Sequence, residues 1–93
     1  MDKQAIAQEI IDRVKRSKEP DYKAWTIGLS HDPKTRRAQH ESDGKDTQYW
    51  MQWTANSLGD AQEVETFFIN EKDMKGGTGG DLSPSRIIYV YIF

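Results

Sequence analysis

The sequence predicts a small α+β domain in which a three-stranded, mainly antiparallel sheet packs against about three helices. Segments with helical and with strand periodicity alternate along the chain, in the order helix, strand, helix, strand, helix, strand. A chain of 93 residues supports one modest core, so residues 1–93 are expected to form a single domain. Residues 86–93 are the most apolar β-favouring run, and such a strand has to be paired inside a sheet.

The first predicted helix covers residues 3–17. Ile6, Ile10 and Val14 recur every four residues and define its apolar face. Basic residues crowd its last turns, where they complement the helix dipole, and Pro20 ends it. The apolar stripe is narrow and aliphatic, so we expect this helix to pack against the sheet rather than to lie on a membrane.

Two further helices are marked by their N-terminal caps. One begins at Asp32-Pro33, where Asp caps the helix and Pro occupies its first turn, and it runs to about residues 39–41. The other begins after Ser57, and its predicted apolar face comprises Ala61, Val64 and Phe68, flanked by Phe67 and Ile69. Residues 22–29 and 48–55, rich in β-branched and aromatic side chains, are the other predicted strands.

The composition limits the classes of protein to consider. The chain has no cysteine, which excludes disulfide bonds and thiolate metal sites. It has no apolar run of about 18 residues and no signal-peptide core at residues 1–4, so we expect a cytoplasmic protein with no membrane partner.

Charge is unevenly distributed although the net charge is only −2. Residues 13–45 contain nine Lys/Arg and five Asp/Glu, whereas the rest of the chain is acidic. A basic half of this kind can contact phosphates without the whole protein being basic. The alternative interpretation is a solvated surface with uneven charge.

The most informative candidates lie on the predicted helix after Asp32. Arg36 and His40 are four residues apart and therefore share one helical face. A guanidinium beside an imidazole can bind a phosphate and move a proton, with Arg37 and Lys34 as further phosphate or nucleic-acid contacts. The alternative is a surface helix whose cations face only water.

Three other features are candidates for binding. The glycine-rich run from Lys75 through Gly76 and Gly77 offers backbone N–H groups that can hold an anion, or else it is a helix end followed by a tight turn. Glu65, at the boundary of an apolar helix face, can hold Mg²⁺ with waters completing the shell, or is an ordinary surface acid. Three aromatic residues around position 50 either stack bases or pack the core, namely Tyr49, Trp50 and Trp53.

The segment from Trp25 to His40 resembles the second half of the GIY-YIG nuclease motif. Thr26-Ile27-Gly28 stands where that family has Tyr-Ile-Gly, with Arg36 and His40 at favoured distances downstream. Ala61-Gln-Glu-Val-Glu65 is similar to the family's Ala-x-x-x-Glu. The resemblance covers about residues 24–72 and implies that Glu65 binds Mg²⁺.

The chain departs from the family pattern at three places. No Gly-Ile-Tyr strand precedes residue 25, but residues 88–91 of the C-terminal strand can fill its place, as in a circular permutation. Tyr89 or Tyr91 then takes the role of a family tyrosine. Thr26 replaces the second tyrosine, and no Asn follows Glu65 at the family's phosphate-side position.

The resemblance implies a GIY-YIG-like, Mg²⁺-dependent endonuclease of the kind found in phages and mobile elements. Arg36 then stabilises phosphate charge, and His40 or a C-terminal Tyr helps to activate the nucleophile. One alternative is a non-catalytic module on the same scaffold that binds nucleic acid or protein. Another is a structural protein that forms a homodimer through its C-terminal strand.

Overall fold

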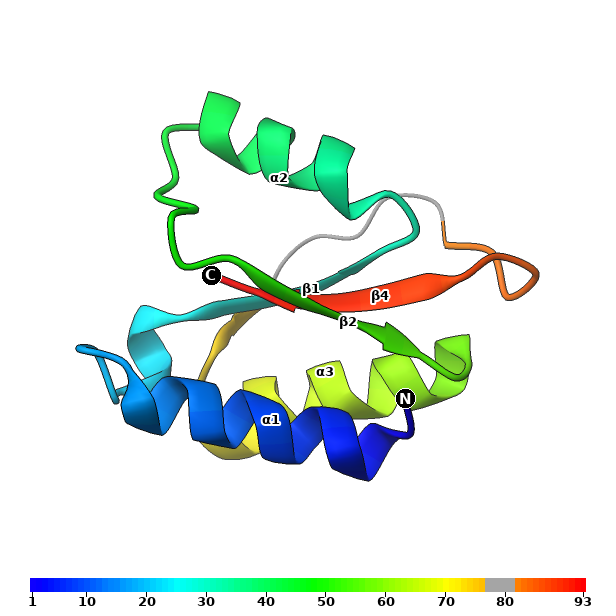
Figure 1. Cartoon of the computed structure of the whole chain (residues 1–93), viewed down its shortest axis with the longest axis horizontal. Helices are drawn as coiled ribbons and strands as arrows, with labels where there is room; N and C mark the ends of the chain where they lie inside the picture. Colours follow the sequence, from blue (N-terminus) through cyan, green and yellow to red (C-terminus); the bar gives the residue numbers. More distant parts are fainter. Residues whose placement is uncertain (77–81) are drawn as a thin grey trace.

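The computed structural model describes residues 1–76 and 82–93. The described helices are α1 (Lys3–Arg16), the 3₁₀ turn η1 (Tyr22–Ala24), α2 (Pro33–Ser42) and α3 (Leu58–Lys72). The strands are β1 (Thr26–Ser30), β2 (Met51–Ala55), β3 (Lys75–Gly76) and β4 (Ile88–Ile92). The fold is thus α+β, with the three predicted helices around one mixed sheet of order β2-β4-β1-β3 (Figure 1).

The sheet separates two layers of helices. Helices α1 and α3 cover one face, and α2 lies over the other (Figure 1). Alternate residues of β4 serve the two sides, because successive side chains of a strand point to opposite faces. Ile88, Val90 and Ile92 are buried in the core with α1 and α3, which leaves Tyr89 and Tyr91 on the side of α2.

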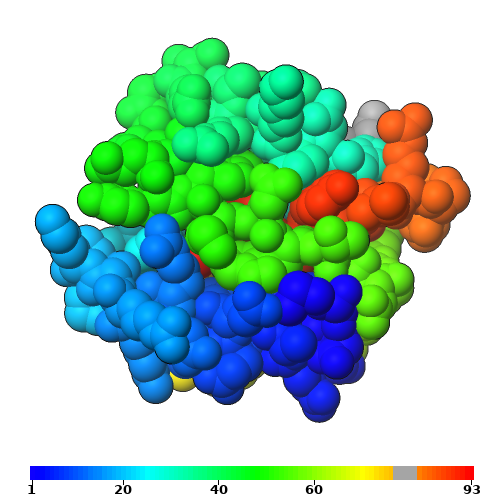
Figure 2. Space-filling view, in the orientation of Figure 1, coloured from blue at the N-terminus to red at the C-terminus, as the bar shows by residue number. Residues whose placement is uncertain are grey.

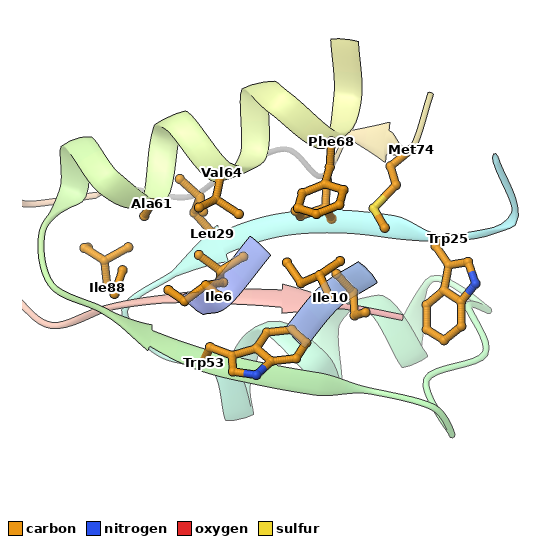
Figure 3. Close-up of a cluster of buried hydrophobic side chains, with 14 of the residues drawn as sticks. Ile6, Ile10, Trp25, Leu29, Trp53, Ala61, Val64, Phe68, Met74 and Ile88 are labelled. Atoms are coloured by element: carbon orange, nitrogen blue, oxygen red, sulfur yellow. The ribbon is translucent and has the colours of Figure 1, made fainter. Parts of the chain in front are cut away.

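The core forms where the periodicity predicts it. Ile6, Ile10 and Val14 of α1 are fully buried against the sheet. From α3, Phe68, Ala61 and Val64 join the same core beside α1, on the same face of the sheet (Figure 3). Phe67 was expected to flank this face but is 40% exposed, since adjacent helical residues lie about 100° apart around the axis.

The two predicted helix caps are confirmed. The Asp32 side chain accepts a hydrogen bond from the Thr35 N–H at 3.2 Å, with Pro33 in the first turn. The Ser57 hydroxyl accepts one from the Asp60 N–H at 3.1 Å. Each bond satisfies a backbone donor that the first turn of a helix leaves without a partner.

The prediction of three strands was wrong by one short strand. β3 has two residues and pairs in parallel with the start of β1, so the described part of the glycine-rich run begins as a strand. The cause is at the end of α3, where Asp73 adopts the left-handed conformation (φ 62°) and turns the chain back along β1. Gly77 lies outside the described residues.

The strand predicted at residues 22–29 begins and ends later in the structure than expected. Residues 22–24 form η1, because the Asp21 side chain accepts a hydrogen bond from the Lys23 N–H and stabilises a turn. The strand proper runs from Thr26 to Ser30. Likewise, the strand predicted at 48–55 begins only at Met51.

β4 occupies the inside of the sheet, as its apolar sequence requires. It pairs antiparallel with β1 on one side and with β2 on the other. Both edges of β4 are therefore paired within the chain. This strand cannot pair with a second copy to form the homodimer that the sequence allowed. In the part of the chain that the structure describes, no helix has the length and apolar character to span a bilayer.

Candidate functional site

The candidate site is built around a tyrosine that lies across a glycine. Tyr91 of β4 is directly opposite Gly28 of β1. A Cβ atom at Gly28 would lie 2.3 Å from the Tyr91 hydroxyl and 2.5 Å from its Cζ. The phenol can cross β1 only because position 28 has no side chain, and Tyr91 is fully buried there.

Helix α2 brings two polar groups to the Tyr91 hydroxyl. His40 Nε2 lies 2.9 Å from the hydroxyl oxygen, and the Arg36 side chain also forms a hydrogen bond with it. The two residues reach the same atom because they are four apart on one face of the helix. Arg36 Nη1 further donates to Gln39 Oε1 at 2.9 Å, within the same helix.

Glu65 of α3 acts on the same tyrosine electrostatically. Burial raises the pKa of Tyr91, Arg36 opposes that shift, and the Glu65 carboxylate adds to it. Glu65 is itself half-buried, and this burial raises the pKa of its carboxyl group. Two residues of α2 therefore contact the Tyr91 hydroxyl, and Glu65 of α3 influences the same group through its charge alone.

Aromatic rings enclose this arrangement. Trp50 stacks on Tyr91 with ring centroids 4.4 Å apart and an interplanar angle of 14°. Phe93, two residues after Tyr91 and so on the same side of the chain, lies 4.6 Å from the His40 ring. Sequence reasoning treated Trp50 as a core or base-stacking residue and missed this role. The available signal was its position just before a strand that pairs with β4.

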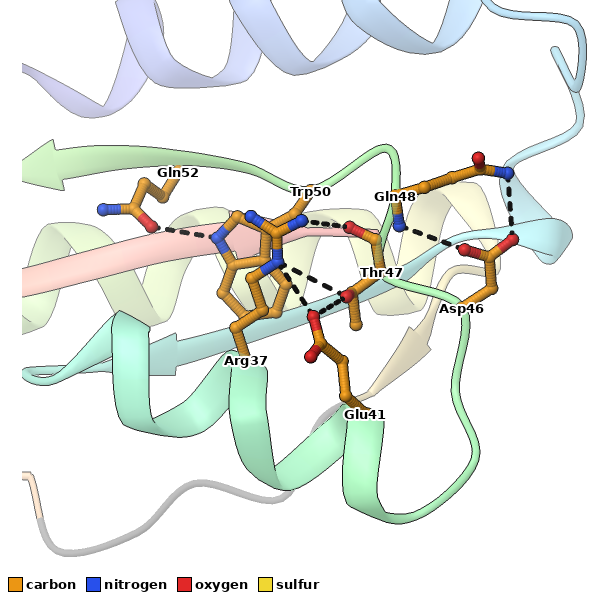
Figure 4. Close-up of polar contacts among 7 residues, drawn as sticks. All are labelled: Arg37, Glu41, Asp46, Thr47, Gln48, Trp50 and Gln52. Carbon is orange, nitrogen blue, oxygen red and sulfur yellow. Dashed lines mark hydrogen bonds and ion pairs between the residues drawn. The ribbon is translucent and has the colours of Figure 1, made fainter.

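Other predicted site residues lie apart from this cluster. The Arg37 guanidinium donates to the Thr47 carbonyl at 3.0 Å and forms an ion pair with Glu41 at 3.3 Å (Figure 4). It also lies over the Trp50 ring, 5.9 Å from its centroid, so Arg37 supports the aromatic cover. The remaining predicted residues are Lys34, exposed on α2, Lys75 and Gly76 in β3, and Tyr89, half-buried on the side of Tyr91.

A pocket opens beside the cluster. It is lined by Ser30, His31, Asp32, Thr35, Arg36, Gln39 and Leu82. The Arg36 side chain lines this pocket and also forms a hydrogen bond with the Tyr91 hydroxyl, whereas Tyr91 itself is buried. A ligand entering the pocket therefore meets Arg36, and Tyr91 acts on such a ligand through Arg36.

The residues around Glu65 fit only a metal ion that takes few protein ligands and keeps most of its coordinated waters. Within residues 1–76 and 82–93, no three His, Asp or Glu side chains gather to form a metal cage. Mg²⁺ commonly binds through one or two carboxylates and substrate phosphates while keeping several waters. Glu65 can supply one such carboxylate.

His40 is held in its neutral form. Burial lowers the pKa of its imidazole, the nearby Arg36 and Lys45 lower it further, and Asp43 opposes them. As pH falls below about 6.5, the unfolded chain takes up this proton first, so the folded state loses stability until its own lower pKa is passed.

We therefore expect the unfolding free energy of the wild type to fall more steeply than that of His40→Asn between about pH 7.5 and about pH 5.5. Urea unfolding at several pH values measures the difference. Parallel pH dependences in the two proteins would contradict a lowered pKa of the half-buried His40.

Comparisons with protein-family models, with curated proteins and with solved structures found no match to this chain. A functional conclusion therefore depends on the chain's own geometry, above all on the groups gathered at Tyr91.

Proposed function

We propose that this protein is a Mg²⁺-dependent endonuclease of the GIY-YIG type that hydrolyses phosphodiester bonds in nucleic acids. The observation that carries the proposal is the contact of Arg36 and His40 with the Tyr91 hydroxyl, whose pKa the Glu65 carboxylate also raises. These residues come from separate parts of the chain, and the resemblance in the sequence singles out all four. A cation, a neutral imidazole and a carboxylate that can hold a metal ion are groups that can catalyse phosphodiester hydrolysis.

The topology supports the permuted form of the resemblance. β4 runs antiparallel to β1, which carries Thr26-Ile27-Gly28. A tyrosine-bearing strand thus lies beside the Tyr-Ile-Gly equivalent, where a circular permutation requires it. Of the two candidate tyrosines, Tyr91 is favoured because its hydroxyl contacts His40 and Arg36.

Each residue has a distinct task in this proposal. Arg36, at the pocket, binds the scissile phosphate and stabilises the charge that builds up as water attacks phosphorus. Tyr91 is a positioning residue that holds Arg36 and His40, and neutral His40 can accept a proton. Glu65 would hold Mg²⁺, which when bound supplies a Lewis acid for the phosphate oxygens and for water. The phosphorus–oxygen bond to the leaving nucleotide breaks, and solvent protonates that oxygen.

The test is a Mg²⁺ titration of plasmid and RNA cleavage with wild type, Glu65→Gln and Glu71→Gln. Glu71 is the matched control, an exposed glutamate on the same helix. We expect Glu65→Gln to raise the Mg²⁺ concentration for half-maximal cleavage by about 10-fold or more, because it removes a charged ligand. Glu71→Gln should behave as wild type.

Two outcomes contradict the proposal. One is the same Mg²⁺ dependence in wild type and Glu65→Gln. The other is the absence of cleavage by wild type, which together with retained binding would favour the non-catalytic binding module.

A further inference from the structure

A second pocket lies at the C-terminal end of α1, away from the Tyr91 cluster. It is lined by Arg13, Arg16, Ser17, Lys18, Glu19, Trp25 and Tyr49. Three of these side chains are cations and one is a carboxylate, so the pocket favours an anion. In Figure 2 the end of α1, in light blue, and the green segment before β2 lie next to each other at the left of the molecule.

The walls of this pocket are fixed by hydrogen bonds. The Trp25 indole N–H donates to the Glu19 carbonyl at 2.8 Å, which ties the turn after α1 to the start of β1. The Ser17 hydroxyl donates to the Val14 carbonyl at 2.6 Å and holds the end of the helix. Such a pocket loses little conformational entropy when a ligand binds.

Two neighbouring residues of the pocket bear on ligand binding, and Arg13 Nη2 donates to the Tyr49 carbonyl oxygen at 3.5 Å. The Arg13 Nε atom is buried and has no hydrogen-bond partner, although a buried N–H normally has one. Tyr49 is 49% exposed, and its ring is available beside the cations. A cationic groove with an exposed aromatic ring is the combination that binds single-stranded nucleic acid, through phosphates and one stacked base.

The pocket is connected to the Tyr91 cluster by neighbouring residues. Tyr49 lines the pocket, and the next residue, Trp50, stacks on Tyr91. Trp25 precedes Gly28 by three residues, which is about 10 Å along an extended chain.

We propose that this pocket binds a single-stranded segment of the nucleic acid, with phosphates at Arg13, Arg16 and Lys18 and one base stacked on Tyr49. That the segment flanks the cleaved bond rests on the proposed function. The binding itself does not, because it requires neither Mg²⁺ nor Glu65.

The experiment measures binding of a fluorescent single-stranded oligonucleotide in EDTA, where no cleavage takes place. The variants are Tyr49→Ala and Arg16→Ala, with Lys15→Ala as the matched control. Arg16 and Lys15 are both exposed at the end of α1, but only Arg16 lines the pocket.

We expect Tyr49→Ala to weaken binding by roughly 5- to 150-fold, the range measured for loss of one stacked base. Arg16→Ala should reduce the slope of log affinity against log salt by about 0.7, as for one phosphate contact. Lys15→Ala should change neither value.

Equal weakening by Arg16→Ala and Lys15→Ala, or no effect of Tyr49→Ala, would overturn the inference. A wild type that cleaves with Mg²⁺ but binds no single strand in EDTA would overturn it while leaving the proposed function intact. Binding with the expected variant pattern but without cleavage would support this inference and contradict the proposed function.

Discussion

Replacing Arg36 by alanine is expected to lower the cleavage rate constant by about 10²- to 10³-fold. Arg36 is the member of the Tyr91 cluster that also lines the open pocket, so in the proposed function it is the group that binds the phosphate. A guanidinium fixed at the Tyr91 hydroxyl needs no reorganisation as negative charge develops, and its loss removes transition-state stabilisation. Single-turnover cleavage with saturating protein measures this step.

Two variants make the result specific. Lys34→Ala removes an exposed cation from the same helix, so it should weaken binding at low salt and leave the rate constant within about 2-fold of wild type. Arg36→Lys keeps the charge but loses the planar fork of donors, and we expect an intermediate rate. Equal losses in Arg36→Ala and Lys34→Ala would mean that only positive charge on α2 matters.

Gly28→Ala is expected to destabilise the fold by about 1–3 kcal/mol, the usual cost of overpacking. The new methyl group would stand 2.3 Å from the Tyr91 hydroxyl, and stacking on Trp50 limits how far the ring can move. The φ angle of Gly28 lies outside the left-handed region, so the cost is a contact and not backbone strain. Urea unfolding measures it, and cleavage should fall as Tyr91 is displaced from Arg36 and His40.

Gly59→Ala is the matched control for this substitution. The nearest atom to a Cβ at Gly59 is the Ser57 hydroxyl oxygen at 3.9 Å, so alanine fits there without a clash. In a helix it should be neutral or stabilising by up to about 1 kcal/mol. In a Tyr91→Leu background Gly28→Ala should cost much less than in wild type; an unchanged cost would show that Tyr91 is not the obstacle.

Much of the fold follows from local signals in the sequence. The spacing of Ile6, Ile10 and Val14 and the caps at Asp32 and Ser57 locate the three helices, because both depend on neighbouring residues. β3 was missed since two residues carry no periodicity, and its pairing depends on the turn at Asp73. Strand order likewise depends on contacts between distant segments.

The site was predictable to a similar degree. Arg36 and His40 could be paired because helical geometry alone puts them on one face. Tyr89 and Tyr91 could not be distinguished, since residues two apart in a strand share a face. The register decides between them, because it places Tyr91 opposite a glycine. The burial of Tyr91 beneath Trp50 depends on tertiary packing, which no local pattern records.

The pairing of Tyr91 with Gly28 has a consequence for how the protein acquires its site. More than sixty residues separate the two in the chain, although they are adjacent in the sheet. Closing so long a loop costs entropy before any contact repays it, and contacts of this kind slow folding. Arg36 and His40 lie on one face of α2 through local helix geometry alone, whereas the hydroxyl that they contact is supplied by the distant β4. The Tyr91 cluster therefore forms only when this long loop closes and β4 pairs with β1.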